Sequence, residues 1–407
     1  MVADAKSSAT QAQSKVLAGI RVLDFGRFIA GPCAAAILGD LGAEVIRVDK
    51  RGGSEDRVMI PVTEQGEGAM FLQNNRNKRS ITLNPAREGG AELVRRLVAQ
   101  SDIVVANLPF STVKTMKLDI ESLREVRPDV ILLMSSAYGS GGPYSDRVGF
   151  DGVGQVMSGA VYRSGTPEQP VRTMVPYVDY ATALSGVAGV LAALRHRDMT
   201  GEGQMVETSL LASALMIASG FLIEQGVLAC DRRAMLNRAQ LAAPVDMFKV
   251  TDGWIFVQAV GDAIYARWAR LMGEEQPWLT EPRFATDALR GENGEEISAR
   301  MAQWCQSRSR SQALAELEQV RIPAYPIYSP QEALDDPHVQ AMGYFKMIDY
   351  PGLPRPAPVV ETPFRMSRTP PEYRSAPPTL GAHTQEVLLE LGYDDAQIDA
   401  LKAAGTI

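Results

Sequence analysis

Residues 20–136 alternate between short apolar strands and amphipathic helices, and this alternation constrains the fold more than any other feature of the sequence. The helix expected after the third strand places Leu93 and Leu97 on one face. Strand–helix–strand alternation predicts an α/β protein, with a parallel sheet covered by helices on both faces. Ligands of such sheets bind beyond the carboxyl ends of the strands. Strands are expected at Ile20–Phe25, Ala43–Asp49, Arg79–Asn84, Asp102–Asn107, Asp129–Ser136 and Met205–Ser209.

The chain has 407 residues, too many for one simple core, and the pattern of its sequence changes at about residue 228. Beyond that point, alternating residues around Asp252 and Gly253 predict a β-hairpin, and amphipathic helices follow. Residues 350–378 are rich in proline, which restricts them to extended loop or edge strand. A second, smaller α+β domain is therefore expected, followed by an irregular segment and C-terminal helices.

The composition excludes several classes of function. The net charge of −7 argues against a general nucleic-acid or anionic-membrane surface. No apolar run reaches the length of a membrane span, and the polar N-terminal residues lack the apolar core of a signal peptide. Three scattered cysteines fit reduced thiols in a cytoplasm, and three scattered histidines match no zinc signature. A cytoplasmic protein without a metal is expected.

The loop after the first strand has the position of a dinucleotide-binding turn but not its glycine spacing. Gly26 and Gly31 form neither GxGxxG nor a Walker loop. Asp49, at the end of the second strand, imitates a ribose-binding carboxylate, although an acidic residue is common there by chance. A nicotinamide dehydrogenase is a weak alternative on this pattern.

Cations gather in two loops of this acidic chain. Lys50 and Arg51 follow the second strand, and Arg76, Lys78 and Arg79 precede the third. Such a run is often only a solvated surface loop. It also suits a phosphate clamp, because clustered cations bind a ligand with several phosphates. The pattern favours an anionic, nucleotide-like ligand.

Asp179 stands at the head of a long helix expected to reach about His196. An Asp in this place is most often an N-cap, worth about 0.5–2 kcal/mol. The alternative is a reactive group, because small residues after Asp179 let a flat ligand or another segment approach closely. Close helix packing would explain those small residues without any chemistry. They are Ala181, Ala183, Ser185, Gly186, Ala188 and Gly189.

From Leu17 to Ile407 the chain resembles the family III CoA-transferases. The matching segments occur in family order and at family spacing. They are LAGIRVLDFGRFIAGPCAAAILGDLGAEVIRVDKRGG, NRNKRSITLN, GFDGVGQVMSG, VRTMVPYVDYATALSGVAGVLAALRHRDMTGEGQ, and the ending LGAHTQEVLLELGY with LKAAGTI.

The resemblance implies that Asp179 is the nucleophile of an acyl-CoA:carboxylate CoA-transferase. It would attack a donor thioester to give a mixed anhydride, and the released thiolate would then give an aspartyl-CoA thioester. With a reference pKa of about 3.9, an Asp is expected to be ionised at neutral pH without a base. A helix N-terminus would favour that anion by about 0.3–1 kcal/mol.

The resemblance also assigns the ligand contacts. Acyl-CoA is a substrate, a carboxylic acid is its partner, and no tightly bound cofactor is implied. Lys50 would contact phosphate, and Lys78 and Arg79 are nearby candidates. The other residues at family CoA positions are Phe28, Ile29, Ala30, Leu83, Asn107 and Leu108.

The family fold implies a Rossmann-like large domain and a smaller α+β domain, in ring-like chains that interlock as a homodimer. The large domain would take residues 18–227, and the small domain residues 228–330. Residues 331–407 would return to the large domain, and residues 1–17 would form a flexible tail.

The sequence departs from its relatives at informative places. Formyl-CoA:oxalate enzymes carry Gln where this chain has Ile29, and the glycine run that shields their intermediate is missing between Cys230 and Phe248. Thr115 replaces a family arginine. The α-methylacyl-CoA racemases need a histidine where this chain has Phe150, which cannot carry a proton. A racemase-like isomerase and a non-catalytic CoA-binding protein remain the alternatives.

Overall fold

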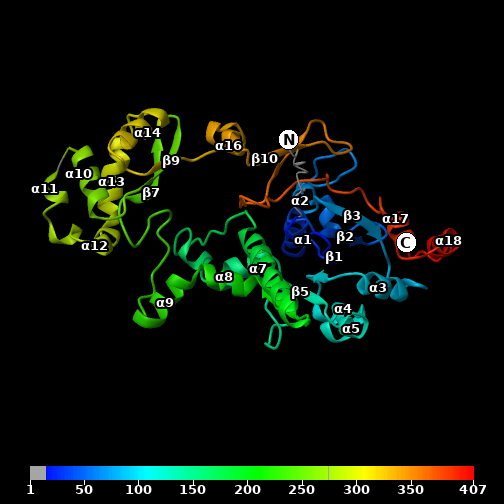
Figure 1. The fold of residues 1–407 in the computed structure, drawn as a ribbon. Coiled ribbons are helices and arrows are strands. Elements are labelled where there is room, and N and C mark those ends of the chain that lie inside the picture. Colours follow the sequence, from blue (N-terminus) through cyan, green and yellow to red (C-terminus); the bar gives the residue numbers. More distant parts are fainter. Residues whose placement is uncertain (1–14, 274) are drawn as a thin grey trace, which may run out of the picture. The chain divides into compact units, whose positions relative to one another are not determined.

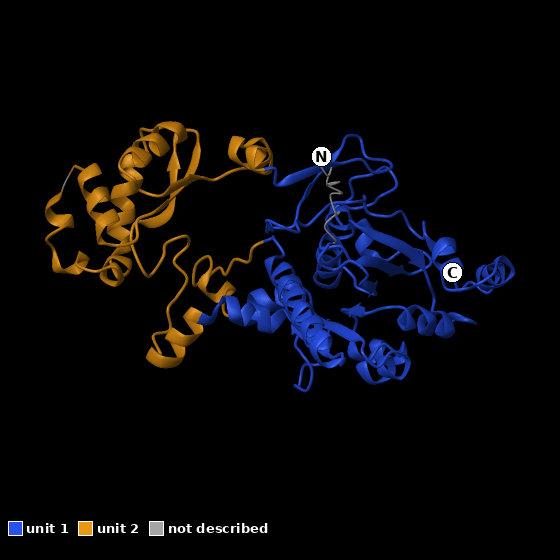
Figure 2. Cartoon of the chain, in the orientation of Figure 1, with its two compact units in different colours: residues 1–158, 174–219, 343–407 blue, residues 159–173, 220–342 orange. Residues whose placement is uncertain are grey.

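The computed structural model describes residues 15–273 and 275–407. The chain forms two compact units, coloured separately in Figure 2. Unit 1 comprises residues 1–158, 174–219 and 343–407, and unit 2 comprises residues 159–173 and 220–342. Of the tail expected at residues 1–17, residues 1–14 lie outside the described part, whereas Leu17 is buried in the core of unit 1.

Unit 1 is built on a six-stranded parallel sheet with the order β3-β2-β1-β4-β5-β6. Figure 1 labels β1, β2, β3 and β5 of this sheet. The order reverses between β1 and β4, and ligands of such sheets bind where the order reverses. All six strands lie where the sequence predicts them, so the α/β prediction is confirmed. They are β1 (Arg21–Asp24), β2 (Glu44–Asp49), β3 (Lys78–Thr82), β4 (Ile103–Ala106), β5 (Ile131–Ser136) and β6 (Met205–Ser209).

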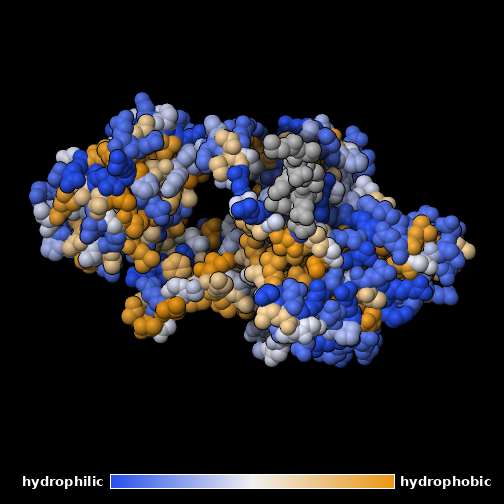
Figure 3. Space-filling model, viewed as in Figure 1, coloured by the Kyte–Doolittle hydropathy of each residue, from blue (hydrophilic) through white to orange (hydrophobic). Residues whose placement is uncertain are grey.

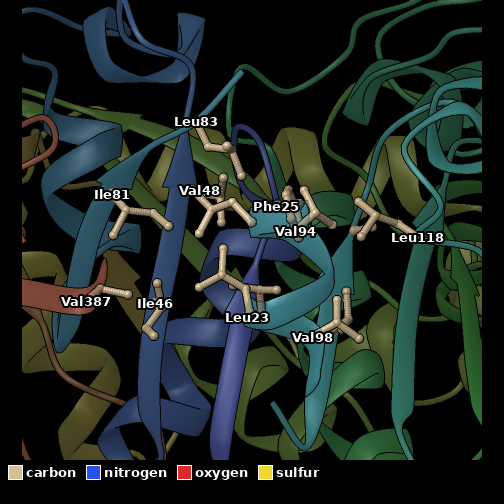
Figure 4. Close-up of a cluster of buried hydrophobic side chains, with 14 of the residues drawn as sticks. Leu23, Phe25, Ile46, Val48, Ile81, Leu83, Val94, Val98, Leu118 and Val387 are labelled. Carbon is tan, nitrogen blue, oxygen red and sulfur yellow. The ribbon is translucent and has the colours of Figure 1, made fainter. Parts of the chain in front are cut away.

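Helices cover both faces of the sheet. Alternate residues of a strand point to opposite sides, so each strand contributes side chains to the core on both faces. Leu23 and Ile46 point to the face covered by α3 (Gly90–Ala99), α5 (Ile120–Val126), α17 (Thr384–Glu390) and α18 (Asp395–Ala403). Figure 4 shows this cluster around Leu23 and Phe25, with Val387 reaching it from the C-terminal helices. The opposite face carries α1 (Ala30–Asp40) and α7 (Tyr177–Thr200).

The small residues of α7 allow the helix to pack closely against the sheet. A Cβ added at Gly189 would lie 2.4 Å from Val206 Cγ1, and one at Gly186 would lie 3.1 Å from the Leu133 methyl groups. Packing therefore explains these two glycines without chemistry. By length and composition alone, α7 could cross a membrane, contrary to the expectation from the sequence, but its inner face belongs to the sheet core.

The remaining elements of unit 1 frame the edges of the sheet. The strands β10 (Phe345–Ile348) and β11 (Ala357–Val360) pair antiparallel within the proline-rich segment. The short helices are η1 (Glu55–Val58), α2 (Ala69–Asn74), α4 (Phe110–Thr115), α6 (Asp151–Met157) and α8 (Leu210–Ile217).

Unit 2 has its own core, in which Trp268 packs against Tyr265 and Trp278. The predicted hairpin is present as β7 (Val245–Val250) and β8 (Gly253–Gln258), and β9 (Ala324–Pro326) pairs antiparallel with β8. The helices are η2 (Val161–Arg163), α9 (Ser219–Leu228), α10 (Asp262–Leu271), α11 (Glu275–Trp278), η3 (Pro282–Phe284), α12 (Asp287–Glu292), α13 (Gly294–Cys305), α14 (Arg310–Gln319), α15 (Pro330–Asp335) and α16 (Pro337–Met342).

The units differ from the expected domains at three places. Residues 159–173 join unit 2, because Gly165 bridges to Leu236 and Arg163 forms an ion pair with Glu224. Unit 2 extends over residues 220–342 instead of 228–330, and the return to unit 1 begins at residue 343 instead of 331. These changes depend on contacts between distant segments, which local composition does not encode.

Candidate active site

A pocket of about 810 Å³ lies in unit 1, at the carboxyl edge of its parallel sheet. Its walls are the loops that follow β1 to β5, together with the first turn of α7. The structure thus brings together most of the predicted site residues, which come from segments far apart in the chain. The predicted residues that line it are Phe28, Ala30, Lys50, Leu83, Asn107, Leu108 and Asp179. Ile29 is absent from the lining because its side chain is buried in the core.

Asp179 is the third residue of α7 and is not its cap. The cap is supplied by Asp151 of α6, whose Oδ2 accepts the N–H of Val178 at 2.8 Å and that of Asp179 at 3.1 Å. The interpretation of Asp179 as an N-cap is therefore wrong. Within the described residues, the Asp179 side chain accepts no hydrogen bond and forms no ion pair, and it lines the pocket.

The protonation of Asp179 also differs from the expectation. Partial burial, followed by the nearby charge of Asp151, raises the pKa of Asp179 to about 7. Burial disfavours the charged form of a carboxyl, and a like charge adds to that effect. A raised pKa gives Asp179 a larger protonated fraction at neutral pH than an exposed Asp would have.

The loop after β1 is held by Asn107. The N–H of Arg27 donates to Asn107 Oδ1 at 2.7 Å, and Asn107 Nδ2 donates to the Arg27 carbonyl at 2.7 Å. The Asn107 amide is thus committed to the protein backbone, although the residue lines the pocket. Phe28 follows in the left-handed region, with a φ of 61°, a conformation that a bulky residue rarely adopts. Its ring meets the Phe150 ring edge-on, with centroids 5.4 Å apart.

Lys78 does not reach the pocket, contrary to its expected role as a phosphate contact. Its buried Nζ donates to Asp24 Oδ2 and to the Pro32 carbonyl, both at 2.8 Å, and to Asn75 Oδ1 at 2.9 Å. Burial lowers the pKa of Lys78 to about 8 in spite of the Asp24 charge. Because Asp24 also accepts the N–H of Gly26, Lys78 supports the β1 loop from inside the fold.

Arg79 also lies outside the pocket lining. Its guanidinium donates to Glu386 at 2.8 Å and to Glu390 at 2.7 Å, and it also pairs with Glu44. These carboxylates tie β3 to α17, so Arg79 joins the C-terminal helices to the sheet. The expected phosphate contact is therefore replaced by an ion-pair cluster.

The cations that do line the pocket are Lys50, Arg51 and Arg27. Lys50 is exposed and forms an ion pair with Glu55. Arg27 was not predicted as a site residue, and Arg51 was recognised only as part of a basic loop. The available signal was their position, since each follows a strand that ends at the same edge of the sheet.

Asp49, which resembles a ribose-binding residue in the sequence, is buried and has other partners. Its carboxylate accepts from Arg47 at 3.0 Å and from Arg57 at 2.7 Å. Burial alone would raise the pKa of Asp49, but the Arg47 charge and the Arg57 hydrogen bond hold it well below its usual range. Asp49 is therefore a structural residue. Among residues 15–273 and 275–407, no group of three or more His, Cys, Asp or Glu side chains could hold a metal ion.

Comparison with known proteins gives consistent matches over nearly the whole chain. The family model described as CoA-transferase family III matches residues 17–384. The β subunit of succinyl-CoA–L-malate CoA-transferase from Chloroflexus aurantiacus is 33% identical over 399 residues, 96% of this chain and 98% of that protein. Human succinyl-CoA:glutarate CoA-transferase is 32% identical over 406 residues, 97% of this chain and 90% of that protein. A CAIB/BAIF family protein from Brucella suis has a crystal structure with a TM-score of 0.81 at 31% identity, covering 93% of this chain and 100% of that one.

Proposed function

The chain belongs to CoA-transferase family III, and from this premise we propose that it moves CoA from a donor acyl-CoA to an acceptor carboxylic acid, with Asp179 as the covalent nucleophile. One observation carries the assignment to Asp179. Its carboxylate has no partner among the described residues and lines the pocket that Lys50, Arg51 and Arg27 also line. A carboxylate left in this state is available to react.

The reaction exchanges acyl groups and needs no net proton transfer. A carboxylate oxygen of Asp179 attacks the thioester carbonyl, the C–S bond breaks, and CoA leaves as a thiolate. The thiolate then attacks the aspartyl carbonyl, and the donor acid leaves as a carboxylate. An acceptor carboxylate attacks the resulting aspartyl-CoA thioester and displaces the thiolate, which takes the new acyl group and regenerates Asp179.

The pocket supplies position and partial desolvation for these steps. The cations after β1 and β2 suit the phosphates of CoA, because charge-assisted hydrogen bonds to phosphate are strong. Holding the thioester against a carboxylate converts a slow bimolecular reaction into an effectively unimolecular one, and such effective molarities reach roughly 10⁵–10⁸ M. The apolar rings of Phe28 and Phe150 also line this pocket.

The acid substrates are proposed to be short dicarboxylates. The two relatives above are named for succinyl-CoA with malate or glutarate, acids that carry a second carboxylate. The cations that line the pocket provide positive charges for the second carboxylate of such an acid when it binds beside the thioester. The chain is correspondingly expected to accept succinyl-CoA as a donor.

The chain is further proposed to be a cytoplasmic protein that forms an interlocked homodimer. Apolar side chains are exposed on α8, at Met216 and Ile217, and on α9, at Ile223, Val227 and Leu228. Figure 3 shows apolar residues gathered on the surfaces of these helices. Exposed apolar surface of this kind marks an interaction site. Light scattering at several protein concentrations should give the mass of two chains, and a single-chain mass would contradict the dimer.

Isotope exchange tests the proposed transfer. The protein is incubated with succinyl-CoA and ¹³C-labelled glutarate or malate, and mass spectrometry follows the label into the CoA ester. Asp179→Ala should retain the fold and lose exchange by about 10³-fold or more, because the covalent intermediate cannot form. Asp198→Ala, an exposed change near the other end of α7, is the matched control and should exchange label like the wild type. Wild-type rates in Asp179→Ala would refute the mechanism.

A further inference from the structure

Asp151 is a buried carboxylate with an unusual set of partners. Asp151 is only 8% exposed, and none of the described residues forms an ion pair with it. It accepts the N–H groups of Val178 and Asp179 and a hydrogen bond from Gln155. It is not part of the pocket lining. A buried carboxylate without a cation is costly, so this arrangement calls for an explanation.

The N–H groups that Asp151 occupies would otherwise be available to Asp179. The first N–H groups of a helix have no partner within the helix, and acidic side chains of the first turn commonly bond to them or are stabilised by them. An Asp179 side chain folded back on its own helix would be a stabilised anion that points away from the substrate. Occupation of these donors by a residue from α6 removes that alternative.

We infer that Asp151 is a positioning residue for the proposed nucleophile: by occupying the N–H groups of Val178 and Asp179, it leaves both oxygens of the Asp179 carboxylate free to attack the thioester. This inference rests on the proposed function. Asp151 does not touch the substrate, and it gains or loses no bond in the reaction. The electron pair that forms the anhydride comes from Asp179, and the C–S bond of the donor breaks.

The charge of Asp151 adds to the effect of its hydrogen bonds. After burial, it is the charged group that raises the pKa of Asp179, and a more basic carboxylate donates its electron pair more readily. Five described elements pack against α7, and two of them, α8 and β5, carry no titratable side chain. Besides Asp151 of α6, the titratable groups on the others are Cys33 and Asp40 of α1 and Glu207 of β6. The first turn of α7 itself adds Tyr177 and Tyr180.

These other groups do not replace Asp151. Burial raises the pKa of Cys33 to about 11, so the thiol is neutral at pH 7. Burial also raises the pKa of Tyr177 and of Tyr180. Asp40 is paired with Arg76 at 2.7 Å, and Glu207 accepts hydrogen bonds from Ser140. Arg27, Lys50 and Arg51, with Glu55, line the pocket that the Asp179 carboxylate faces.

The test measures the chemical step in Asp151→Asn. Rapid-quench kinetics follow CoA release from succinyl-CoA between about pH 5 and pH 9, where the ionisation of Asp179 sets the acid limb. Asn keeps an acceptor oxygen but lacks the charge, so the midpoint of the acid limb should fall by about one pH unit or more. The plateau rate should fall about tenfold, because the Asp179 carboxylate becomes less basic and because a neutral amide oxygen holds the N–H groups of Val178 and Asp179 less strongly than a carboxylate does. Asp151→Glu should restore the midpoint toward the wild-type value.

Asp394→Asn is the matched control. It makes the same chemical change at the cap of α18, where Asp394 accepts the N–H of Gln397 and lies outside the pocket. This variant should keep the wild-type profile. A wild-type midpoint and plateau in Asp151→Asn would overturn the positioning role while leaving the proposed transfer intact. Failure of the wild type to release CoA would instead overturn the proposed function. If circular dichroism shows that Asp151→Asn folds poorly, the pH profile of Asp151→Glu is the test instead. A folded Asp151→Glu variant whose acid limb does not lie near pH 7 would contradict the proposal.

Discussion

Two regions of unit 1 bury carboxylates, and they treat them in opposite ways. Around the end of β2, Asp49 and Asp56 are matched by Arg47 and Arg57, and the pKa of Asp49 is held well below its usual range. At the start of α7, Asp151 lies near Asp179, no cation of the described residues lies at hydrogen-bond distance from either carboxylate, and the pKa of Asp179 is raised. Breaking a buried pair is costly, so the paired region serves the fold, whereas the Asp179 carboxylate, which has no partner among the described residues, is proposed to react. Burial of an acid therefore does not identify its role, and the groups that contact its carboxylate must be known as well.

Removing a cation from the paired region should have the largest effect on stability. Arg47 is fully buried, and it donates to Asp49 at 3.0 Å and to Asp56 at 2.9 Å. Arg47→Met would leave both carboxylates buried with a missing partner, and such a change costs about 3–5 kcal/mol. Urea denaturation measures this cost. A loss below about 1 kcal/mol would show that the paired region tolerates unmatched charge.

Acid should inhibit the reaction through the unpaired region. In the proposed mechanism only the deprotonated Asp179 attacks, and burial raises the pKa of Asp179 to about 7. The rate of CoA release should fall about tenfold for each pH unit below that value, or about 100-fold at pH 5. The measurement is kcat/KM against pH with donor and acceptor that do not titrate in this range. A rate that stays constant down to pH 5 would mean that Asp179 is ionised like an ordinary surface acid.

Neutralising Asp179 should stabilise the protein. Because the pKa of Asp179 is higher in the folded chain than in the unfolded chain, the folded chain binds more protons between about pH 4 and pH 7, and stability falls as pH rises through that window. Asp179→Asn should therefore be more stable than the wild type at pH 8, by about 1–2 kcal/mol after allowance for solvent screening. The two proteins should converge near pH 4. Equal stability at both pH values would argue against the raised pKa.

The smallest effect on the free energy of unfolding is expected for a cation whose ion pair is exposed to solvent. Lys50 and Glu55 form an ion pair with more than half of each side chain in solvent. Lys50→Met should change the free energy of unfolding by less than about 0.5 kcal/mol, because exposed pairs contribute little. Measured beside Arg47→Met, this variant separates the effect of pairing from the effect of burial. A large loss would show that the pocket loop depends on this ion pair for its structure.

The sequence predicted the features that neighbours along the chain determine. The strands of the parallel sheet, the hairpin around Gly253 and the long helix with Asp179 near its start were all recognisable, because periodicity acts over a few residues. The position of cations just after strands also pointed to the correct edge of the sheet. The resemblance to known CoA-transferases added the proposed role of Asp179, which no local pattern contains.

Only the tertiary structure decided which polar groups meet. The cap of α7 is Asp151, which lies 28 residues before Asp179, and the partners of Lys78 include Asp24, 54 residues away. The sequence left Asp179 open as a helix cap or a reactive group, and the resemblance placed Lys78 among the candidates for a CoA contact. Burial and pairing depend on segments that the fold brings together, so a side chain predicted to bind a ligand can instead support the fold. The same long-range contacts leave the Asp179 side chain without a partner among the described residues, and its proposed chemistry depends on this property.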